Sequence, residues 1–125
     1  MKGCLRIGFL LVALVAAAIY CAIPHPTHNQ AKIQAIAAES QRLMAAYPIN
    51  LSRGYAEVPK DRWPPAIAGL KPFGVTVYPG TVDIMTKPFF DGGWGYGFAK
   101  DKRNLGMLEQ SWSELGHGVY WHGPC

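Results

Sequence analysis

The clearest alternation of large and small side chains lies between residues 89 and 99, which read FFDGGWGYGFA. Rings occupy four even positions, Phe90, Trp94, Tyr96 and Phe98, and glycine or alanine occupies the odd positions from Gly93 to Ala99. Side chains alternate between the two faces of a strand, whereas on a helix these rings would spread around the axis. Four glycines within six residues would also cost a helix roughly 1 kcal/mol each relative to alanine. The pattern predicts a strand at the middle of a sheet, with one face of rings turned inward and one almost bare face.

A second pattern, between residues 27 and 47, repeats at the spacing of a helix. Its apolar side chains share one side and its polar ones fall elsewhere, as in an amphipathic helix. Thr27 and Gln30 have the spacing of a capping box at the start of this helix, and Tyr47-Pro48 ends it. The apolar positions are Ile33, Ile36, Ala37, Leu43, Met44 and Tyr47.

Three shorter elements are predicted between residues 63 and 86. Two prolines introduce residues 63–70, which predicts a short helix because proline is tolerated in a first helical turn. Residues 74–78 and 81–86 alternate apolar and polar positions on either side of Pro79-Gly80, a turn pair. This alternation predicts a β-hairpin that leads into the strand of rings.

The C-terminal residues predict one more helix and one more strand. Leu108, Trp112 and Leu115 have helical spacing, and Gly116 would end that helix. Residues 119–121 would form a last strand. Together these elements predict an α+β domain in which the amphipathic helix packs on a three- or four-stranded antiparallel sheet.

The N-terminal residues 1–23 predict a membrane anchor or a signal peptide. The uncharged run 7–23 would span roughly 26 Å as a helix, slightly short of the ~30 Å hydrocarbon core. Adding Leu5, with Arg6 snorkelling to the interface, closes most of that gap. We therefore expect residues 5–23 to contact a membrane as an uncleaved transmembrane helix. The alternative is a cleaved signal peptide, since Ala16-Ala17-Ala18 satisfies the small-residue rule.

The remaining chain is predicted to be a proline linker, residues 24–26, and one small domain, residues 27–125. Lys2 and Arg6 are expected to stay on the cytoplasmic side, which places the domain outside the cytoplasm. We expect a single-pass protein of the cytoplasmic (inner) membrane with its domain in the periplasm. If the leader is cleaved, the domain is instead secreted to the periplasm.

Charge and cysteine content exclude several classes of protein. The chain has a formal charge of +4, but from residue 24 onward ten basic residues face eight acidic ones. Because these charges nearly balance and the basic residues are scattered, the sequence excludes the basic patch that a nucleic-acid-binding surface requires. The domain holds a single cysteine, Cys125, so a disulfide scaffold is excluded as well.

No set of residues predicts a catalytic, cofactor or metal site, and we expect the protein not to be an enzyme. The glycine-rich run lacks the Lys-Ser/Thr pair of a phosphate loop. No cysteine pair or acidic cluster accompanies the histidines, so we expect them to be solvated or hydrogen-bonded rather than metal ligands. The histidines are His25, His28, His117 and His122.

Trp94, Tyr96 and Trp121 are the candidate contacts for a ligand or partner. Exposed rings on a strand could stack on a sugar ring or a peptide. The alternative is that these rings form the core face of the sheet, and the glycines then indicate close approach of another element.

Three segments carry a resemblance to other proteins. Residues 63–67 read WPPAI and are followed by Leu70, Pro72, Val75 and Val77; residues 90–97 read FDGGWGYG, and residues 118–124 read GVYWHGP. This pattern resembles an uncharacterised family of small bacterial proteins that are membrane-anchored or exported. The resemblance covers about half of the chain, from Trp63 onward. It implies an outward-facing domain, with no assigned activity and no site residues.

Two functions are therefore expected. The first is a non-catalytic interaction or assembly factor in the bacterial envelope, with another envelope protein as its partner. The alternative is a module that binds cell-wall sugar or peptide through an aromatic surface.

Overall fold

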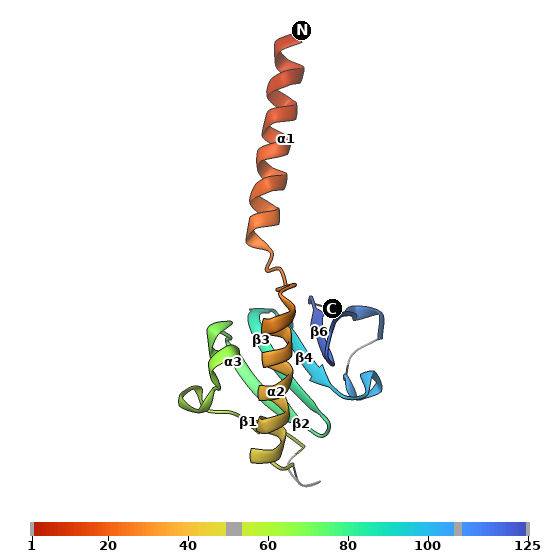
Figure 1. The fold of residues 1–125 in the computed structure, drawn as a ribbon. Helices are drawn as coiled ribbons and strands as arrows, with labels where there is room; N and C mark the ends of the chain where they lie inside the picture. The colour runs from red at the N-terminus through yellow and green to blue at the C-terminus, as the bar shows by residue number, and fades with distance from the viewer. Residues whose placement is uncertain (1, 50–53, 107–108, 125) are drawn as a thin grey trace.

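Helix α1 (Lys2–Ala22) projects from one end of a domain built from a β-sheet and helix α2 (Gln30–Ala46) (Figure 1). The structure is a computed structural model, and it describes residues 2–49, 54–106 and 109–124. The side chains of residues 6–22 are all exposed. Among the described residues, no helix combines the length and the apolar character that crossing a membrane requires.

The sheet of the described chain has six antiparallel strands in the order β1-β2-β3-β4-β6-β5, so it is wider than the three or four strands predicted. The class is α+β, as expected. The 74–78 and 81–86 hairpin and the last strand are confirmed, although β3 runs three residues further than predicted. The strands are β1 (Ala56–Glu57), β2 (Gly74–Tyr78), β3 (Thr81–Phe89), β4 (Gly92–Ala99), β5 (Trp112–Gly116) and β6 (Val119–His122).

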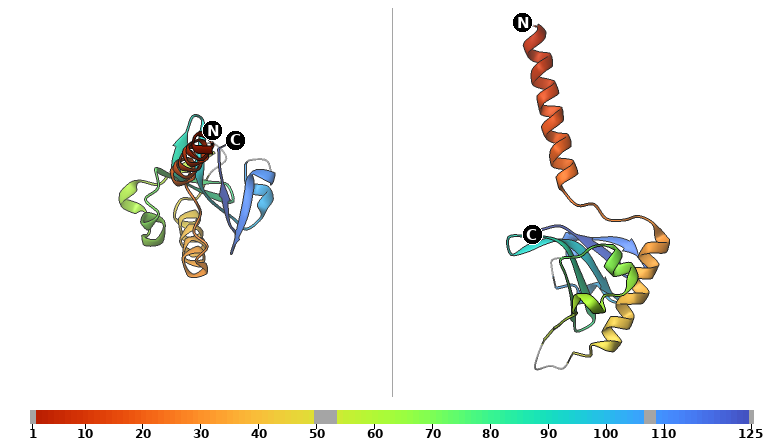
Figure 2. Two further views of the ribbon diagram at one scale, coloured as in Figure 1. Left: turned by 90° about the horizontal axis from the view of Figure 1, so that it is seen from above. Right: turned by 90° about the vertical axis from the view of Figure 1, so that its left-hand side faces the viewer.

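Helix α2 covers one face of the sheet with the apolar stripe predicted from its sequence (Figure 2). Ile33, Ile36 and Leu43 are buried there, together with valines and isoleucines of β2 and β3. Burial of such side chains contributes about 1.5–3 kcal/mol each. The helix ends at Ala46, before Tyr47-Pro48, as predicted.

The start of α2 differs from the predicted capping box. Asn29 is the capping residue, since its side chain accepts a hydrogen bond from the Lys32 amide at 3.1 Å. The backbone N–H of Thr27 instead donates to Tyr96 Oη at 2.8 Å. The Gln30 amide group donates to the carbonyl of Leu115 at 3.3 Å. The predicted capping box is wrong because the helix begins after Asn29, two residues later than a cap at Thr27 requires.

A buried carboxylate joins α2 to the short helix α3 (Pro65–Gly69). Glu39 accepts hydrogen bonds from the backbone N–H groups of Ala66 at 2.9 Å and Ile67 at 2.8 Å. Proline has no N–H, so these are the first two donors of α3 that need an acceptor. Helix α3, predicted over 63–70, follows a 3₁₀ turn, η1 (Lys60–Arg62), and lies on the same side of the sheet as α2 (Figure 2).

Strand β4 lies between β3 and β6, and its rings point toward α2 as predicted. Tyr96 and Phe98 are buried in the core, and Trp94 is partly exposed. Phe90, expected on the same inward face, belongs instead to the turn between β3 and β4 and is 93% exposed. The turn reverses the chain there, so the alternation begins only at Gly92.

The bare face of β4 is covered by a second, smaller apolar cluster, which accounts for the glycines. A Cβ atom placed on Gly97 would lie 2.6 Å from the indole ring of Trp112 and 3.2 Å from Leu105. The predicted close approach of another element is therefore confirmed at this position. The cluster consists of Ala99, Leu105, Trp112 and Tyr120. It is bordered by two 3₁₀ turns, η2 (Lys102–Asn104) and η3 (Glu109–Ser111).

The helix predicted through Trp112 and Leu115 is wrong, because these residues form strand β5. Gly116, His117 and Gly118 all have positive φ and make a tight turn, which returns the chain as β6. Pairing with β6 satisfies the backbone of β5, and this long-range gain outweighs the local helical spacing. Leu108, the first residue of the predicted helix, lies outside the described residues, as does Cys125.

The pairing of β3 with β4 contains one β-bulge. Met85 pairs with Gly95 and Lys87 pairs with Trp94, so Thr86 has no partner across the ladder. The hydroxyl of Thr86 donates to the Trp94 carbonyl at 3.0 Å. The bulge changes which face the following residues of β3 occupy.

Candidate functional site

A cleft of about 710 Å³ opens on the sheet face that is turned away from α2. Its lining comes from strands β2 to β6, with three alternate residues from β3, and from Asn104 of η2 and the nearby Gly106. The lining residues are Tyr78, Pro79, Thr81, Asp83, Met85, Asp91, Gly92, Gly93, Asn104, Gly106, Trp112 and His122. The cleft therefore combines two carboxylates, an imidazole and two aromatic rings.

His122 and Asp83 form the central pair of the cleft. His122 Nε2 lies 3.4 Å from Asp83 Oδ1, and Nδ1 lies 3.2 Å from the carbonyl oxygen of Gly123. Burial of the ring opposes protonation, but the hydrogen bonds to Asp83, Gly123 and Gly93 and the charge of Asp83 together raise the pKa of His122 above 6.5. At mildly acidic pH the pair is therefore a cation held against a carboxylate.

Trp112 packs against this pair. Its ring centroid lies 4.4 Å from that of His122 in an edge-on arrangement. The indole Nε1 is buried and has no hydrogen-bond partner among the described residues. An indole N–H usually finds a partner when it is buried, so the Trp112 N–H is a buried donor that lacks an acceptor among the described residues.

The rim of the cleft is polar. The hydroxyl of Thr81 donates to the carbonyl of Asn104 at 2.9 Å, which fixes η2 to the edge of the sheet. Burial, together with the nearby Asp83 carboxylate, raises the pKa of Tyr78, so its hydroxyl stays a hydrogen-bond donor. Carboxylate acceptors on a partly aromatic floor suit a ligand that carries several donors and one apolar face.

The imidazole of the His122–Asp83 pair is enclosed by its neighbours. The imidazole is only 5% exposed, and it is closed in by Asp83 and Trp112. The nearest hydroxyl along β3, Thr81, already donates to Asn104. No group of three or more metal-ligating side chains was found in the part of the chain that the structure describes.

The three predicted contact residues lie on the opposite, α2-facing side of the sheet. Tyr96 is 3% exposed, and burial raises its pKa, whereas the hydrogen bond from the Thr27 amide opposes this rise. Trp121 is half-buried and packs edge-on against Tyr96 at 4.9 Å. Trp94 lies nearer the β3–β4 turn, where its ring contacts Phe89 at 5.5 Å. The structure thus brings Tyr96 and Trp121 together, partly inside the core, and leaves Trp94 apart from them.

The residues of the cleft were not identified from the sequence, although one signal was present. Thr76, Tyr78, Asp83 and Met85 alternate with the buried residues of the hairpin, so they had to share the opposite face. His122 joins them only through the order β3-β4-β6, which no local pattern reveals. His25, another of the candidate histidines, lies far from the cleft and contacts the carbonyl of Tyr20 at 3.1 Å.

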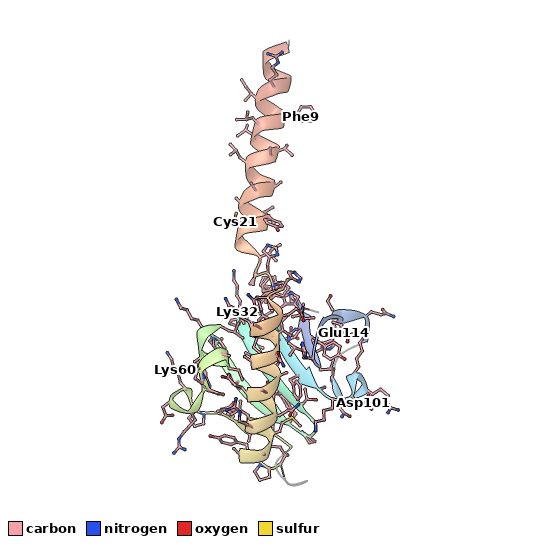
Figure 3. The ribbon with its side chains drawn as sticks, in the orientation of Figure 1. Phe9, Cys21, Lys32, Lys60, Asp101 and Glu114 are labelled. Carbon is pink, nitrogen blue, oxygen red and sulfur yellow. The ribbon has the colours of Figure 1, made fainter. Side chains whose placement is uncertain are left out.

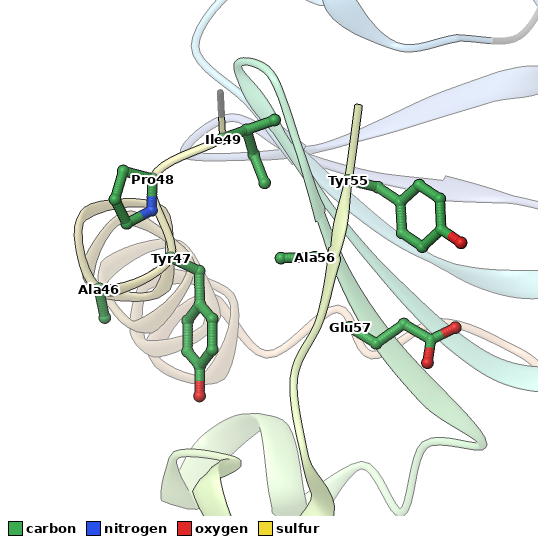
Figure 4. Close-up of a pocket in the computed structure, with 7 residues that line it drawn as sticks. All are labelled: Ala46, Tyr47, Pro48, Ile49, Tyr55, Ala56 and Glu57. Carbon is green, nitrogen blue, oxygen red and sulfur yellow. The ribbon is translucent and has the colours of Figure 1, made fainter. Parts of the chain in front are cut away.

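A second hollow, of about 760 Å³, lies between the end of α2 and strand β1 (Figure 4). Tyr47 and Ile49 line one side, and Ala56, whose side chain points toward α2, lines the other. Figure 4 shows the side chains of Tyr55 and Glu57 pointing away from α2. The described chain is interrupted between residues 49 and 54, beside this hollow. The cleft around His122 is therefore the better defined of the two.

Comparison of the chain with family models, with curated proteins and with solved structures gives no match. The resemblance to small bacterial envelope proteins therefore stays a prediction.

Proposed function

We propose that this protein is a membrane-tethered binding domain of the bacterial envelope, held by α1 and acting through contacts rather than catalysis. The observation that carries the proposal is the surface of α1, whose side chains from Arg6 to Ala22 lie exposed and away from the domain (Figure 3). Phe9 and Cys21 illustrate how they point outward (Figure 3). The exposed large apolar residues are Ile7, Phe9, Leu10, Leu11, Val12, Leu14, Val15, Ile19 and Tyr20.

A surface of this kind is stable only when something apolar covers it. A helix that is apolar on all sides is normally inserted in a bilayer or buried in another protein. The uncharged run of α1 is near the lower end of the 17–25 residues, roughly, that span a bilayer. Arg6 and Lys2 would then lie at the cytoplasmic interface, and the domain would lie in the periplasm. Cleavage near Ala16-Ala17-Ala18 would release the same domain to the periplasm.

The domain beyond the anchor supports a role as an interaction or assembly factor. Its cleft offers carboxylates and a tyrosine hydroxyl, which are groups that can bind a partner. Because the domain would lie in the envelope, its partner would be another envelope protein. We infer no cofactor.

The location is tested by expressing the full chain, tagged at its C-terminus, in a bacterial host. We expect it in the cytoplasmic membrane fraction, resistant to carbonate extraction, with its domain open to protease in spheroplasts. Recovery in the soluble cytoplasm would contradict the proposal. The intact mass of the mature protein distinguishes the uncleaved anchor from the cleaved leader.

A matched pair of variants sharpens this test. Leu14→Arg puts a charge near the middle of the apolar run, at a cost of roughly 2.5–3.5 kcal/mol for insertion. We expect this variant to leave the membrane fraction. Gln34→Arg adds the same charge on the exposed face of α2 and should leave the distribution unchanged.

A second candidate function is binding of cell-wall sugar or peptide, and the cleft is the observation that favours it. Titration with N-acetylglucosamine oligomers or short peptides, followed by NMR, is expected to shift signals of Asp83 and His122. Asp91→Asn should weaken this binding, because Asp91 lines the cleft, whereas Asp61→Asn on the exposed turn η1 should not. Shifts confined to Trp94 and Trp121 would place the ligand on the other face, and an absence of shifts would reject the candidate.

A further inference from the structure

The turn between β3 and β4 carries an exposed cluster of rings that the proposed function does not use. Phe90 is 93% exposed and Phe89 is 47% exposed. Their rings meet edge-on at 4.7 Å, and Phe89 also lies 5.5 Å from Trp94. We refer to Lys87, Phe89, Phe90 and Trp94 as the aromatic tip.

The backbone of the tip is unusual for such bulky residues. Phe90 has a φ of 53°, in the left-handed region that glycine or asparagine ordinarily occupies. A ring that is held in a disfavoured conformation and left in water adds nothing to the folded core. Strained residues of this kind are associated with functional contacts. The exposed rings of the tip are therefore available for a contact outside the domain.

The tip lies at the end of the domain from which α1 departs (Figures 1 and 2). Lys87 Nζ donates to the carbonyl oxygen of Ala22, the last residue of α1, at 2.9 Å. The same ammonium group lies 5.7 Å from the centre of the Trp94 ring, within cation–π range. The tip is therefore placed at the level where the apolar helix ends.

Further exposed aromatic and basic residues lie at this end of the sheet. The Phe73 amide donates to the Met85 carbonyl at 2.7 Å, and the Phe73 ring is exposed. Lys32, near the start of α2, also lies at this end of the domain (Figure 3). Tyr55, by contrast, is an exposed ring at the opposite end, next to Tyr78.

We propose that the aromatic tip is a second membrane contact, which inserts Phe89 and Phe90 at the interface of the outward-facing leaflet beside α1. This inference depends on the proposed anchoring by α1. Tryptophan is enriched at membrane interfaces, where its ring sits at headgroup level. Lysine keeps its stem in the apolar layer and its charge near the lipid phosphates. Two points of attachment would fix the orientation of the domain, so that the cleft, which Asp91 borders, opens next to the lipid surface.

The test uses the full chain, isotope-labelled, in lipid nanodiscs of phosphatidylcholine and phosphatidylglycerol. A gadolinium chelate on lipid headgroups broadens NMR signals near the interface, and a nitroxide on acyl chains broadens those inside the bilayer. We expect the headgroup probe to broaden the amides of Phe89–Asp91 strongly and to leave Gly80, at the other end of the sheet, unaffected. The acyl-chain probe should broaden the amides of α1.

Two variants provide the comparison. Transfer of one phenylalanine ring out of water shifts a partition equilibrium roughly tenfold or more. Phe89→Ser combined with Phe90→Ser should therefore reduce the broadening at Asp91 to the level seen at Gly80. Tyr55→Ser removes a comparably exposed ring from the opposite end and should change nothing at the tip.

Each outcome separates this inference from the proposed function. Broadening of α1 by the acyl-chain probe, without broadening of Phe89–Asp91 by the headgroup probe, would overturn the second contact and leave the anchor standing. An α1 that neither probe affects would overturn the anchor and the second contact with it. Equal broadening at the tip in the wild type and in the double variant would show that the phenylalanine rings are not what holds it there.

Discussion

Replacing Gly97 by alanine would put a methyl group against the indole ring of Trp112. The Cβ atom would lie 2.6 Å from Cζ3 and 2.7 Å from Cη2 of that ring, and 3.2 Å from Leu105. Ordinary van der Waals contact begins near 3.4 Å, so the ring must recede by about 0.8 Å. The second apolar cluster would have to open to admit one methyl group.

Gly97→Ala should lower the free energy of unfolding because the Trp112 ring is tightly packed. The ring is buried, and its edge-on contact with His122 would be disturbed by any retreat from Gly97. Adding a methyl group to a well-packed core destabilises by about 1–3 kcal/mol. We expect Gly97→Ala to fall in this range.

Alanine substitutions at two other glycines provide a comparison for the loss of stability. Gly74 lies in β2 with open space around it and without a positive φ, so Gly74→Ala should be neutral or stabilising by about 0.4–1 kcal/mol. Gly95 faces the backbone carbonyl of Ile84, which cannot move as a side chain can. Gly95→Ala should therefore be the most destabilising of the three.

The assay is urea unfolding of the full chain in mild detergent, followed by near-UV circular dichroism. Combining Gly97→Ala with Trp112→Phe removes the outer ring atoms that clash, so the alanine should cost less in that background than in the wild type. If Gly97→Ala matches Gly74→Ala in unfolding free energy, or if Trp112→Phe gives no relief, the packing argument is refuted.

Three further predictions follow from single contacts. Glu39→Ala leaves one buried and one part-buried N–H group of α3 without an acceptor and should destabilise by about 2–4 kcal/mol in the same urea assay. The raised pKa of His122 means that its stabilising contribution is complete below pH 6.5 and is lost as the pH rises through the folded-state pKa. Asp83→Asn should lower this pKa in an NMR titration and flatten the dependence of stability on pH. Tyr96→Phe removes the acceptor for the Thr27 amide and should cost about 1 kcal/mol, with faster hydrogen exchange at Thr27.

Each of these has its own control. Glu39→Gln keeps one acceptor oxygen and should lie between the wild type and Glu39→Ala; equal stability of all three would contradict the capping role. Glu114→Gln, on an exposed residue of β5, should leave the His122 titration unchanged, and an Asp83→Asn titration identical to the wild type would reject the pair. Unchanged exchange at Thr27 in Tyr96→Phe would show that this amide has another acceptor.

The elements with strong alternation or helical period could be predicted from the sequence. The strand of rings forms because its glycines allow neighbouring elements to pack closely against it. Helix α2 forms because its apolar side packs on the sheet. The two-residue strand β1 carries no period of its own. It exists because its backbone pairs with β2, which no local pattern can indicate.

The aromatic residues show why a ring pattern alone does not locate a binding site. Phe90 and Tyr96 belong to the same alternating run, yet one is almost fully exposed and the other is buried. The position of the turn decides this difference, and the turn depends on where β3 ends. Asp83 and His122 are 39 residues apart and meet only across the width of β4. Their pairing is a property of strand order rather than of sequence spacing.

The single unpaired residue at Thr86 has a consequence for how this domain can vary. In a regular ladder, Lys87 would follow Asp83 and Met85 onto the cleft side, since strand side chains alternate. The bulge transfers Lys87 to the side of Trp94 and Ala22 instead. Deleting Thr86 would therefore make the ladder regular and leave Lys87 opposite Trp94, so β3 can lose this one residue without bringing a positive charge into the cleft.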